Sequence, residues 1–160
     1  MERIERTALR NLIHNEEYSR KVLPFIKEDY FSDRLERLLF KEIYRFITKF
    51  NALPTKEALS IEINDSKDIT EDEYKKITDI IATLNPEKIN LEWLVETTEK
   101  FCKDRAIHNA ILSGIQIIDG KDKKHTPEYL PDLLSDALSV SFDQKVGHDY
   151  LLETKERFDF

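Results

Sequence analysis

The sequence predicts an all-α fold, and three of its properties support this prediction. Only three glycines and five prolines occur among 160 residues, which leaves few positions suited to the tight turns of a β-rich fold. The charged residues are mostly glutamate and lysine, which are good helix formers at exposed positions. Apolar residues also recur every three or four positions, as on the buried face of an amphipathic helix. We therefore expect roughly six or seven helices.

Three helix patterns occupy the first third of the chain. Apolar residues at helical spacing mark a first helix over about residues 2–13. Asn15 is placed to cap a second, shorter helix, which Pro24 makes irregular. Asp33 and Glu36 have the spacing of a capping box, which predicts the start of a long amphipathic helix.

Two shorter helices follow. Leu53-Pro54-Thr55 ends the long amphipathic helix and begins a short one. Thr70 and Glu73 have the spacing of a second capping box, and the helix that they begin ends at Asn85-Pro86.

The longest pattern begins at Asn90, placed as a cap, and runs to Ile118 without a proline. Such a helix is roughly 40 Å long, more than the core of the preceding residues requires. A long helix is stable only if something packs along it. The helix expected over residues 131–140, after a loop at 120–126, would form an antiparallel hairpin with it. The far face of this hairpin would then need a second chain.

No catalytic, metal-binding or nucleotide-binding residues are predicted. The nearest approach to a phosphate-binding loop has Gly114 and Gly120 one residue too far apart, and Asp122 stands where a hydroxyl is required. The four histidines are scattered, and no HExxH motif or Cys-His cluster occurs. The single cysteine, Cys102, lies on an apolar stripe and is expected to be a buried hydrophobic residue.

The net charge of −7 gives no general attraction to nucleic acid. The one concentrated basic loop holds Lys121, Lys123 and Lys124, which are candidates for contact with nucleic acid or an acidic partner. A solvated turn is the simpler interpretation, because no aromatic residue lies between the charges. With no signal peptide, no membrane-spanning segment and a lone cysteine, the chain is expected to be soluble and cytoplasmic.

Apolar surface left over on the long helix indicates an oligomer interface. Trp93 and Phe101 lie where such surface would accumulate. The candidate interface residues are Trp93, Phe101, Arg105, Ile111 and Ile115.

Several segments resemble the N-terminal domain of DnaB-like hexameric replicative helicases. Glu28-Asp29-Tyr30-Phe31 and the following Leu38-Leu39-Phe40-Lys41-Glu42-Ile43 are similar to an acidic and aromatic motif before a helix in that family. Leu53-Pro54-Thr55 matches the turn into the next short helix, and residues 98–106 are similar to the start of the helical hairpin.

The resemblance is closer to the replicative helicases of T-even-like phages. Leu138-Ser139-Val140-Ser141-Phe142-Asp143, followed by Val146-Gly147-His148-Asp149, is similar to the stretch that precedes their motor domain. Together, the similar segments cover nearly the whole chain.

This resemblance implies a globular helical head at residues 1–85, a helical hairpin at 86–141 and a linker segment at 142–160. It implies a collar that pairs through the hairpins, organises a hexameric ring and docks primase. Contact with DNA would be made mainly by the full-length ring, in the cytoplasm of an infected bacterial host. The linker would dock on the motor domain of a neighbouring subunit through Tyr150, Leu151, Leu152 and Phe158.

No ATPase site is expected in this segment, and ATP and Mg²⁺ would be cofactors of an absent motor domain in an ATP-dependent parent helicase. An alternative from a different class is a free-standing helical adaptor, either a helicase loader or an inhibitor, that binds the helicase or primase. A phosphate-binding loop encoded downstream of Phe160 would exclude this alternative.

Overall fold

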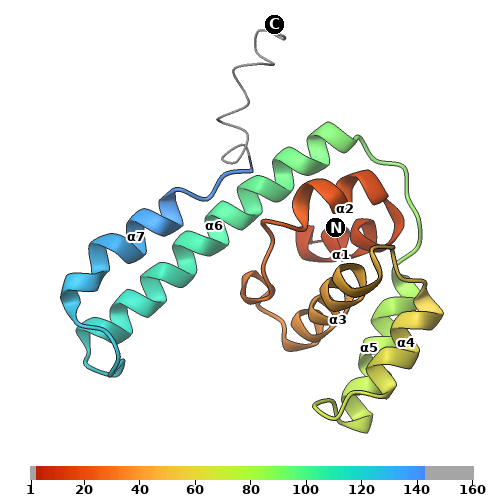
Figure 1. Ribbon diagram of the computed structural model, residues 1–160, viewed down its shortest axis with the longest axis horizontal. Helices are drawn as coiled ribbons and strands as arrows, with labels where there is room; N and C mark the ends of the chain where they lie inside the picture. The colour runs from red at the N-terminus through yellow and green to blue at the C-terminus, as the bar shows by residue number, and fades with distance from the viewer. Residues whose placement is uncertain (1–2, 143–160) are drawn as a thin grey trace, which may run out of the picture. The chain divides into compact units, whose positions relative to one another are not determined.

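The computed structural model describes residues 3–142, and all of its regular structure in this range is helical (Figure 1). The prediction of an all-α fold is confirmed. The helices are α1 (Ile4–His14), α2 (Glu16–Val22), η1 (Glu28–Tyr30), α3 (Arg34–Phe50), α4 (Lys56–Asn64), α5 (Glu71–Thr83), α6 (Leu91–Ile118), η2 (Pro127–Tyr129) and α7 (Leu130–Leu138).

The chain divides into two compact units, residues 1–101 and residues 102–160, and the second is described as far as Phe142. The division falls inside α6, whereas the sequence placed the end of the head at residue 85. The reason is that the first turns of α6 bury Leu94, Thr98 and Phe101 among the residues of the first unit.

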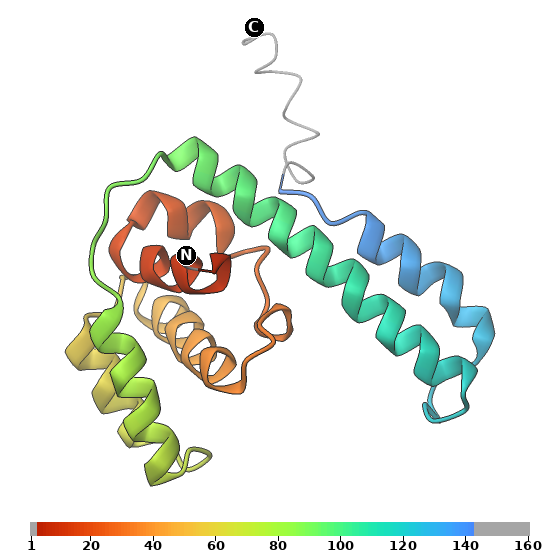
Figure 2. The ribbon, with the colours of Figure 1, turned by 180° about the vertical axis from the view of Figure 1, so that it is seen from behind.

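Helix α3 is the centre of the first unit. It contacts α1, α4, α5 and η1, while α1 also contacts α2, and α4 pairs with α5 (Figures 1 and 2). Its buried residues Leu39, Phe40 and Ile43 are three or four positions apart, as the helical spacing of apolar residues predicts. Phe31, which follows η1, stacks on Phe40 with ring centroids 5.1 Å apart.

Side-chain caps begin most helices of the first unit. Asn15 Oδ1 accepts a hydrogen bond from the backbone N–H of Tyr18, and Asn90 Oδ1 accepts one from that of Trp93. Thr70 and Glu73 form the predicted reciprocal capping box at α5. The predicted caps at these three positions are therefore confirmed.

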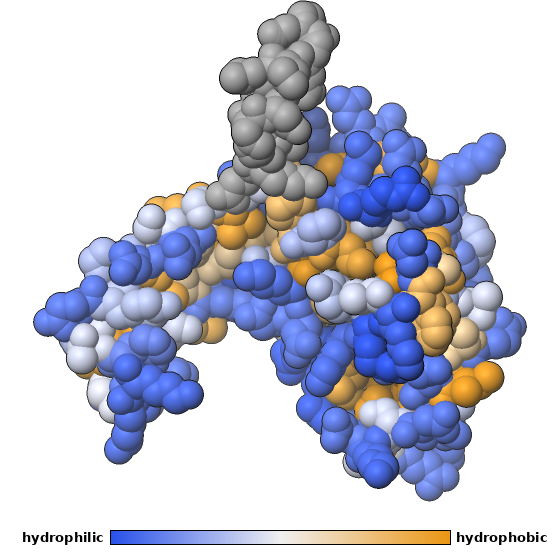
Figure 3. Space-filling model, in the orientation of Figure 1, coloured by the Kyte–Doolittle hydropathy of each residue, from blue (hydrophilic) through white to orange (hydrophobic). Residues whose placement is uncertain are grey.

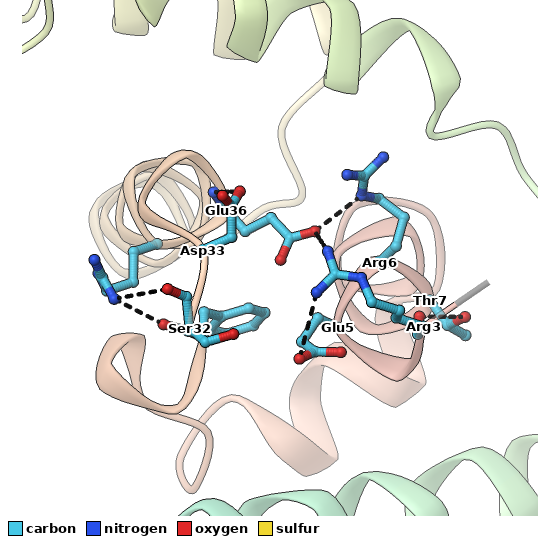
Figure 4. Close-up of polar contacts among 9 residues, drawn as sticks. Arg3, Glu5, Arg6, Thr7, Ser32, Asp33 and Glu36 are labelled. Carbon is cyan, nitrogen blue, oxygen red and sulfur yellow. Dashed lines mark hydrogen bonds and ion pairs between the residues drawn. The ribbon is translucent and has the colours of Figure 1, made fainter. Parts of the chain in front are cut away.

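The capping box predicted at α3 is only half formed. Asp33 caps the helix by accepting the backbone N–H of Glu36 at 3.2 Å. The Glu36 carboxylate instead turns toward α1, where its Oε2 lies 2.5 Å from Arg3 Nη2 and 3.2 Å from Arg6 Nε (Figure 4). A capping prediction uses local spacing only, and it was wrong here because two arginines about thirty positions away offer a stronger partner.

Glu36 is fully buried, and its second oxygen, Oε1, has no hydrogen-bond partner within the described part of the chain. Burial raises the pKa of Glu36, while Arg3 and Arg6 act in the opposite direction and only partly offset it. The folded first unit therefore holds a carboxyl group that binds its proton more tightly than it does in water.

A buried hydrogen bond fastens the beginning of α6 to α2 within the first unit. The Tyr18 hydroxyl lies 2.8 Å from Thr98 Oγ1, and Thr98 Oγ1 donates to the carbonyl of Leu94 at 2.7 Å. Both side chains are fully buried. The contact joins residues 80 positions apart, so it fixes the first turns of α6 on the head.

In the second unit, the later part of α6 and α7 lie side by side and are joined by a loop and η2 (Figures 1 and 2). Gly120, with φ of 77°, ends α6, because a left-handed residue after a helix lets the next N–H groups reach back. Its N–H donates to the carbonyl of Ile117, and that of Lys121 donates to the carbonyl of Gln116, which is the Schellman pattern. The predicted loop and returning helix are thus present, and α7 begins at Leu130.

Candidate protein–protein interface on the helical hairpin

The later part of α6 has an inner face of mostly small residues. Cys102, Ala110 and Ile117 are buried, and Gly114 lies against α7. A Cβ built at Gly114 would be only 3.1 Å from Cδ2 of Leu130. Small side chains at this spacing allow the two helices to approach closely where Gly114 meets Leu130.

The opposite side of the same helix is apolar and exposed. Ile111, Leu112, Ile115 and Ile118 each expose about half or more of their surface, from 49% to 67%. Positions 111, 115 and 118 are separated by four and three residues, which places them along one face of the helix. A surface helix normally presents polar residues to water there.

Helix α7 adds two exposed leucines. Leu134 and Leu138 are one turn apart, and Leu138 is 64% exposed. In Figure 3, apolar side chains alternate with polar ones along this unit. We call the set of Ile111, Leu112, Ile115, Ile118, Leu134 and Leu138 the hairpin apolar surface.

Such a surface favours contact with another apolar surface. Burying a large aliphatic side chain fully is worth about 1.5–3 kcal/mol, so a half-exposed one can still gain roughly 1 kcal/mol. Six of them within one helical hairpin exceed the scattered apolar residues that a monomer normally shows.

The five interface residues predicted from the sequence lie in different surroundings in the structure. Ile111 and Ile115 belong to the hairpin apolar surface, and Arg105 is partly exposed on the same helix. Trp93 is 52% exposed but lies in the first unit. Phe101 is 9% exposed and packs against Phe31 at 6.1 Å between ring centroids, so its ring belongs to the core of the first unit.

Four residues of the hairpin apolar surface were not predicted from the sequence: Leu112, Ile118, Leu134 and Leu138. The two leucines of α7 carry a usable signal, because residues four positions apart lie along one face of a helix. Leu112 and Ile118 carry none, since α6 has apolar residues on all sides and its periodicity does not separate the covered face from the exposed one.

The basic loop between α6 and α7 is ordered by Asp122. Its carboxylate accepts hydrogen bonds from the backbone N–H groups of Lys124, at 2.8 Å, and of His125, and it lies 3.0 Å from His125 Nδ1. These contacts, first of all the one with the His125 side chain, lower the pKa of Asp122. The His125 ring stacks on Tyr129. Lys121, Lys123 and Lys124 are exposed around this turn.

Residues 3–142 can also be compared with the requirements of other kinds of site. Gly114 lies within α6 against Leu130, so the backbone there is helical and not a phosphate-binding loop. Among residues 3–142, no three His, Cys, Asp or Glu side chains are grouped as metal ligands would be. No helix in that range is both long enough and apolar enough to cross a membrane. The linker residues Tyr150, Leu151, Leu152 and Phe158 lie outside the described residues.

Comparison with known proteins shows similarity to a helicase. No family model matches the sequence. The chain is 31% identical over 158 residues to a DnaB-like replicative helicase of Enterobacteria phage T4. The match covers 94% of this chain but 33% of that helicase, so the chain spans about a third of the length of its relative. Over nearly its whole length, the chain is therefore homologous to a segment of a DnaB-like replicative helicase.

Proposed function

We propose that this chain is the N-terminal assembly domain of a phage replicative DNA helicase and that it joins subunits through the hairpin apolar surface. The homology to a helicase segment supports the class of protein. The exposed apolar residues on α6 and α7 support self-association, and this is the observation that carries the proposal.

In this proposal, two copies pair through their hairpins and each covers the apolar residues of the other. A two-fold pair uses the same patch on both copies, so every residue of the patch contributes twice to one contact. Pairs assembled in this way would form the collar of a hexameric ring, for example as a trimer of dimers.

The other roles belong to the full-length protein. The collar would dock primase, and the exposed lysines of the loop at 121–124 are candidates for an acidic partner or nucleic acid. ATP and Mg²⁺ would act in a motor domain outside this segment, with residues 150–158 docking on the neighbouring subunit's motor domain. DNA contact would be made mainly by the full-length ring.

Sedimentation equilibrium of the purified chain tests the self-association. We expect a dimer or a larger oligomer, and we expect Ile115→Asp to shift the equilibrium to monomer. A buried unpaired charge costs about 3–5 kcal/mol, which corresponds to at least a hundredfold weaker association. Ile115 is half exposed in the single chain, so the variant should keep its fold, and far-ultraviolet circular dichroism checks this.

Gln116→Asp is the matched control, since it adds the same charge at the next residue, which is exposed and polar. It should leave the oligomer largely intact. A wild-type chain that stays monomeric at high concentration would contradict the proposal, and so would an Ile115→Asp variant that assembles as the wild type does.

A further inference from the structure

The connection between α6 and α7 carries a pair of stacked aromatic rings next to its lysines. The His125 ring lies on the Tyr129 ring, with centroids 4.3 Å apart and planes inclined by 18°. Tyr129 belongs to η2, so the helical structure after the loop supports the ring that the loop presents. This contact covers one face of His125, yet 40% of its side chain is exposed. The exposed part therefore lies on the side turned away from Tyr129.

The loop holds the His125 ring in place through Asp122. One oxygen of this carboxylate accepts hydrogen bonds from the backbone N–H groups of Lys124, at 2.8 Å, and of His125, at 3.2 Å. The other oxygen lies 3.0 Å from His125 Nδ1. A ring fixed in this way loses little conformational freedom when a flat group stacks on it, which lowers the cost of binding.

The charges around this ring leave the lysines available to a ligand. Two nearby carboxylates, Asp122 and Glu128, already accept hydrogen bonds from donors of the same segment. Asp119 is the third carboxylate, so the formal charges cancel over residues 119–129 and the segment exerts little long-range attraction. Its lysines act instead by direct contact with an anion. All three are exposed: Lys121, Lys123 and Lys124.

From this arrangement we infer that the loop binds single-stranded nucleic acid, with one base stacked on His125 and neighbouring phosphates on the lysines. Proteins that bind single strands combine basic side chains along the backbone with aromatic rings on which bases stack. The face of a base is accessible only where the strand is unpaired, so a duplex offers this loop its phosphates alone. An acidic protein segment would pair with the lysines but would leave the exposed ring without a partner.

Of the acidic partner and the nucleic acid proposed above for these lysines, the aromatic pair favours nucleic acid, and to that extent binding at the loop rests on the proposed function. The loop and the hairpin apolar surface consist of different residues. Affinity for a strand and oligomer size therefore report on them separately, and either can fail without the other.

Fluorescence anisotropy with three labelled probes of about a dozen units each tests the inference: single-stranded oligothymidylate, an abasic oligomer with the same phosphates, and oligoglutamate. We expect oligothymidylate to bind at least about fivefold more tightly than the abasic oligomer, the effect of one stacked base. Three lysine–phosphate contacts predict a salt slope of about −2 on a single strand, so binding should weaken about twentyfold between about 50 and 200 mM salt. Saturable shifts of the Lys124 and His125 amides in ¹H–¹⁵N NMR spectra should locate the site.

Substitutions at histidine test the stacked base. His125→Ala should lower the affinity for oligothymidylate to that for the abasic oligomer. His125→Phe loses the contact with Asp122 but keeps a ring, and it should retain the preference for the strand that carries bases. His108→Ala, the matched control at an exposed histidine of α6, should change neither affinity.

Substitutions at lysine test the phosphate contacts. Replacing the three lysines of the loop together by glutamine should abolish binding of all three probes. Exposed loop residues contribute little to stability, so this variant should keep the circular dichroism spectrum of the wild type. A control that should bind as the wild type does makes the same change of net charge at three exposed lysines of the first unit: Lys27, Lys41 and Lys75.

Equal affinity for oligothymidylate and the abasic oligomer would overturn the inference, and so would an unchanged preference for bases in His125→Ala. The absence of saturable binding at low salt, or full binding by the variant without loop lysines, would also overturn it. Tighter binding of oligoglutamate than of oligothymidylate would assign the loop to an acidic protein instead.

Discussion

Replacing Thr98 by valine removes one oxygen from a buried position and keeps the shape of the side chain. The lost atom accepts the 2.8 Å hydrogen bond from the Tyr18 hydroxyl and donates to the Leu94 carbonyl at 2.7 Å. Tyr18→Phe removes the other side of the first bond and leaves Thr98 bonded to Leu94.

The two substitutions should therefore differ in cost. Tyr18→Phe removes one neutral hydrogen bond whose remaining partner stays satisfied, so we expect about 1 kcal/mol of destabilisation. Thr98→Val takes this partner away from a fully buried phenol hydroxyl, so we expect the larger penalty, about 1–3 kcal/mol. In the double variant, the second substitution should cost less than it does alone, with a coupling energy of about 1 kcal/mol.

The single tryptophan suits the assay. Trp93 lies in the first turn of α6, half exposed and five residues before Thr98, so its fluorescence reports on whether this end of α6 is docked. Urea unfolding curves from Trp93 fluorescence and from circular dichroism give the free energy of unfolding for the four chains. For a unit of about a hundred residues, 1 kcal/mol corresponds to a change in Tm of about 4–8 °C.

The result that refutes this reasoning is a Thr98→Val variant as stable as the wild type together with a coupling energy near zero. The beginning of α6 would then be held on the head by apolar packing alone. A fluorescence transition that precedes the circular dichroism transition in the three variants but not in the wild type would show that the bond acts locally at α6.

Three further predictions concern single positions. Burial raises the pKa of Glu36 above its ordinary value near 4.5, so the folded state binds the proton more tightly than the unfolded state does. The stabilisation that results is fully present below pH 4.5. It is lost as the pH rises through the pKa of Glu36 in the folded state. Glu36→Gln should remove this dependence, so urea unfolding between pH 4.5 and 7.5 should show the variant gaining on the wild type as pH rises; a constant difference would contradict it. Gly114→Val should destabilise the hairpin by about 1–3 kcal/mol in thermal unfolding, because its branched side chain meets Leu130, whereas a Tm equal to that of wild type would show that α7 moves aside freely. Asn51 has φ of 53°, so Asn51→Gly should be nearly neutral and Asn51→Val should cost about 1–2 kcal/mol; similar unfolding midpoints for the two would rule out strain as the cause.

Local signals in the sequence predicted the helices well. Asn15, Thr70 and Asn90 cap helices where the spacing indicated, because a cap depends on residues within one turn. The long helix from residue 91 to residue 118 and the returning helix also depend on local periodicity and on the absence of an internal proline.

Features that depend on distant residues were not predictable. Spacing assigned Glu36 to a capping box, but its partners lie on α1. The first compact unit runs to residue 101, and within it Thr98 bonds to Tyr18, 80 positions away, which no local pattern indicates. The periodicity of the sequence does not distinguish Phe101 from Ile115 as an interface residue. Only the folded structure shows that Phe101 is buried and Ile115 is half exposed.

The side-chain caps described above also have a consequence for evolution. When each helix begins at a cap formed by its own residues, the connecting segments do not determine where the helices begin. Lengthening a surface loop also costs only about 0.6 kcal/mol per doubling of its length. Segments such as residues 65–70, between α4 and α5, can then vary in length and composition while the helices that they connect begin at the same residues. Related proteins with helices capped in this way can diverge to 31% sequence identity and keep the same helices, if selection preserves a few cap and core positions.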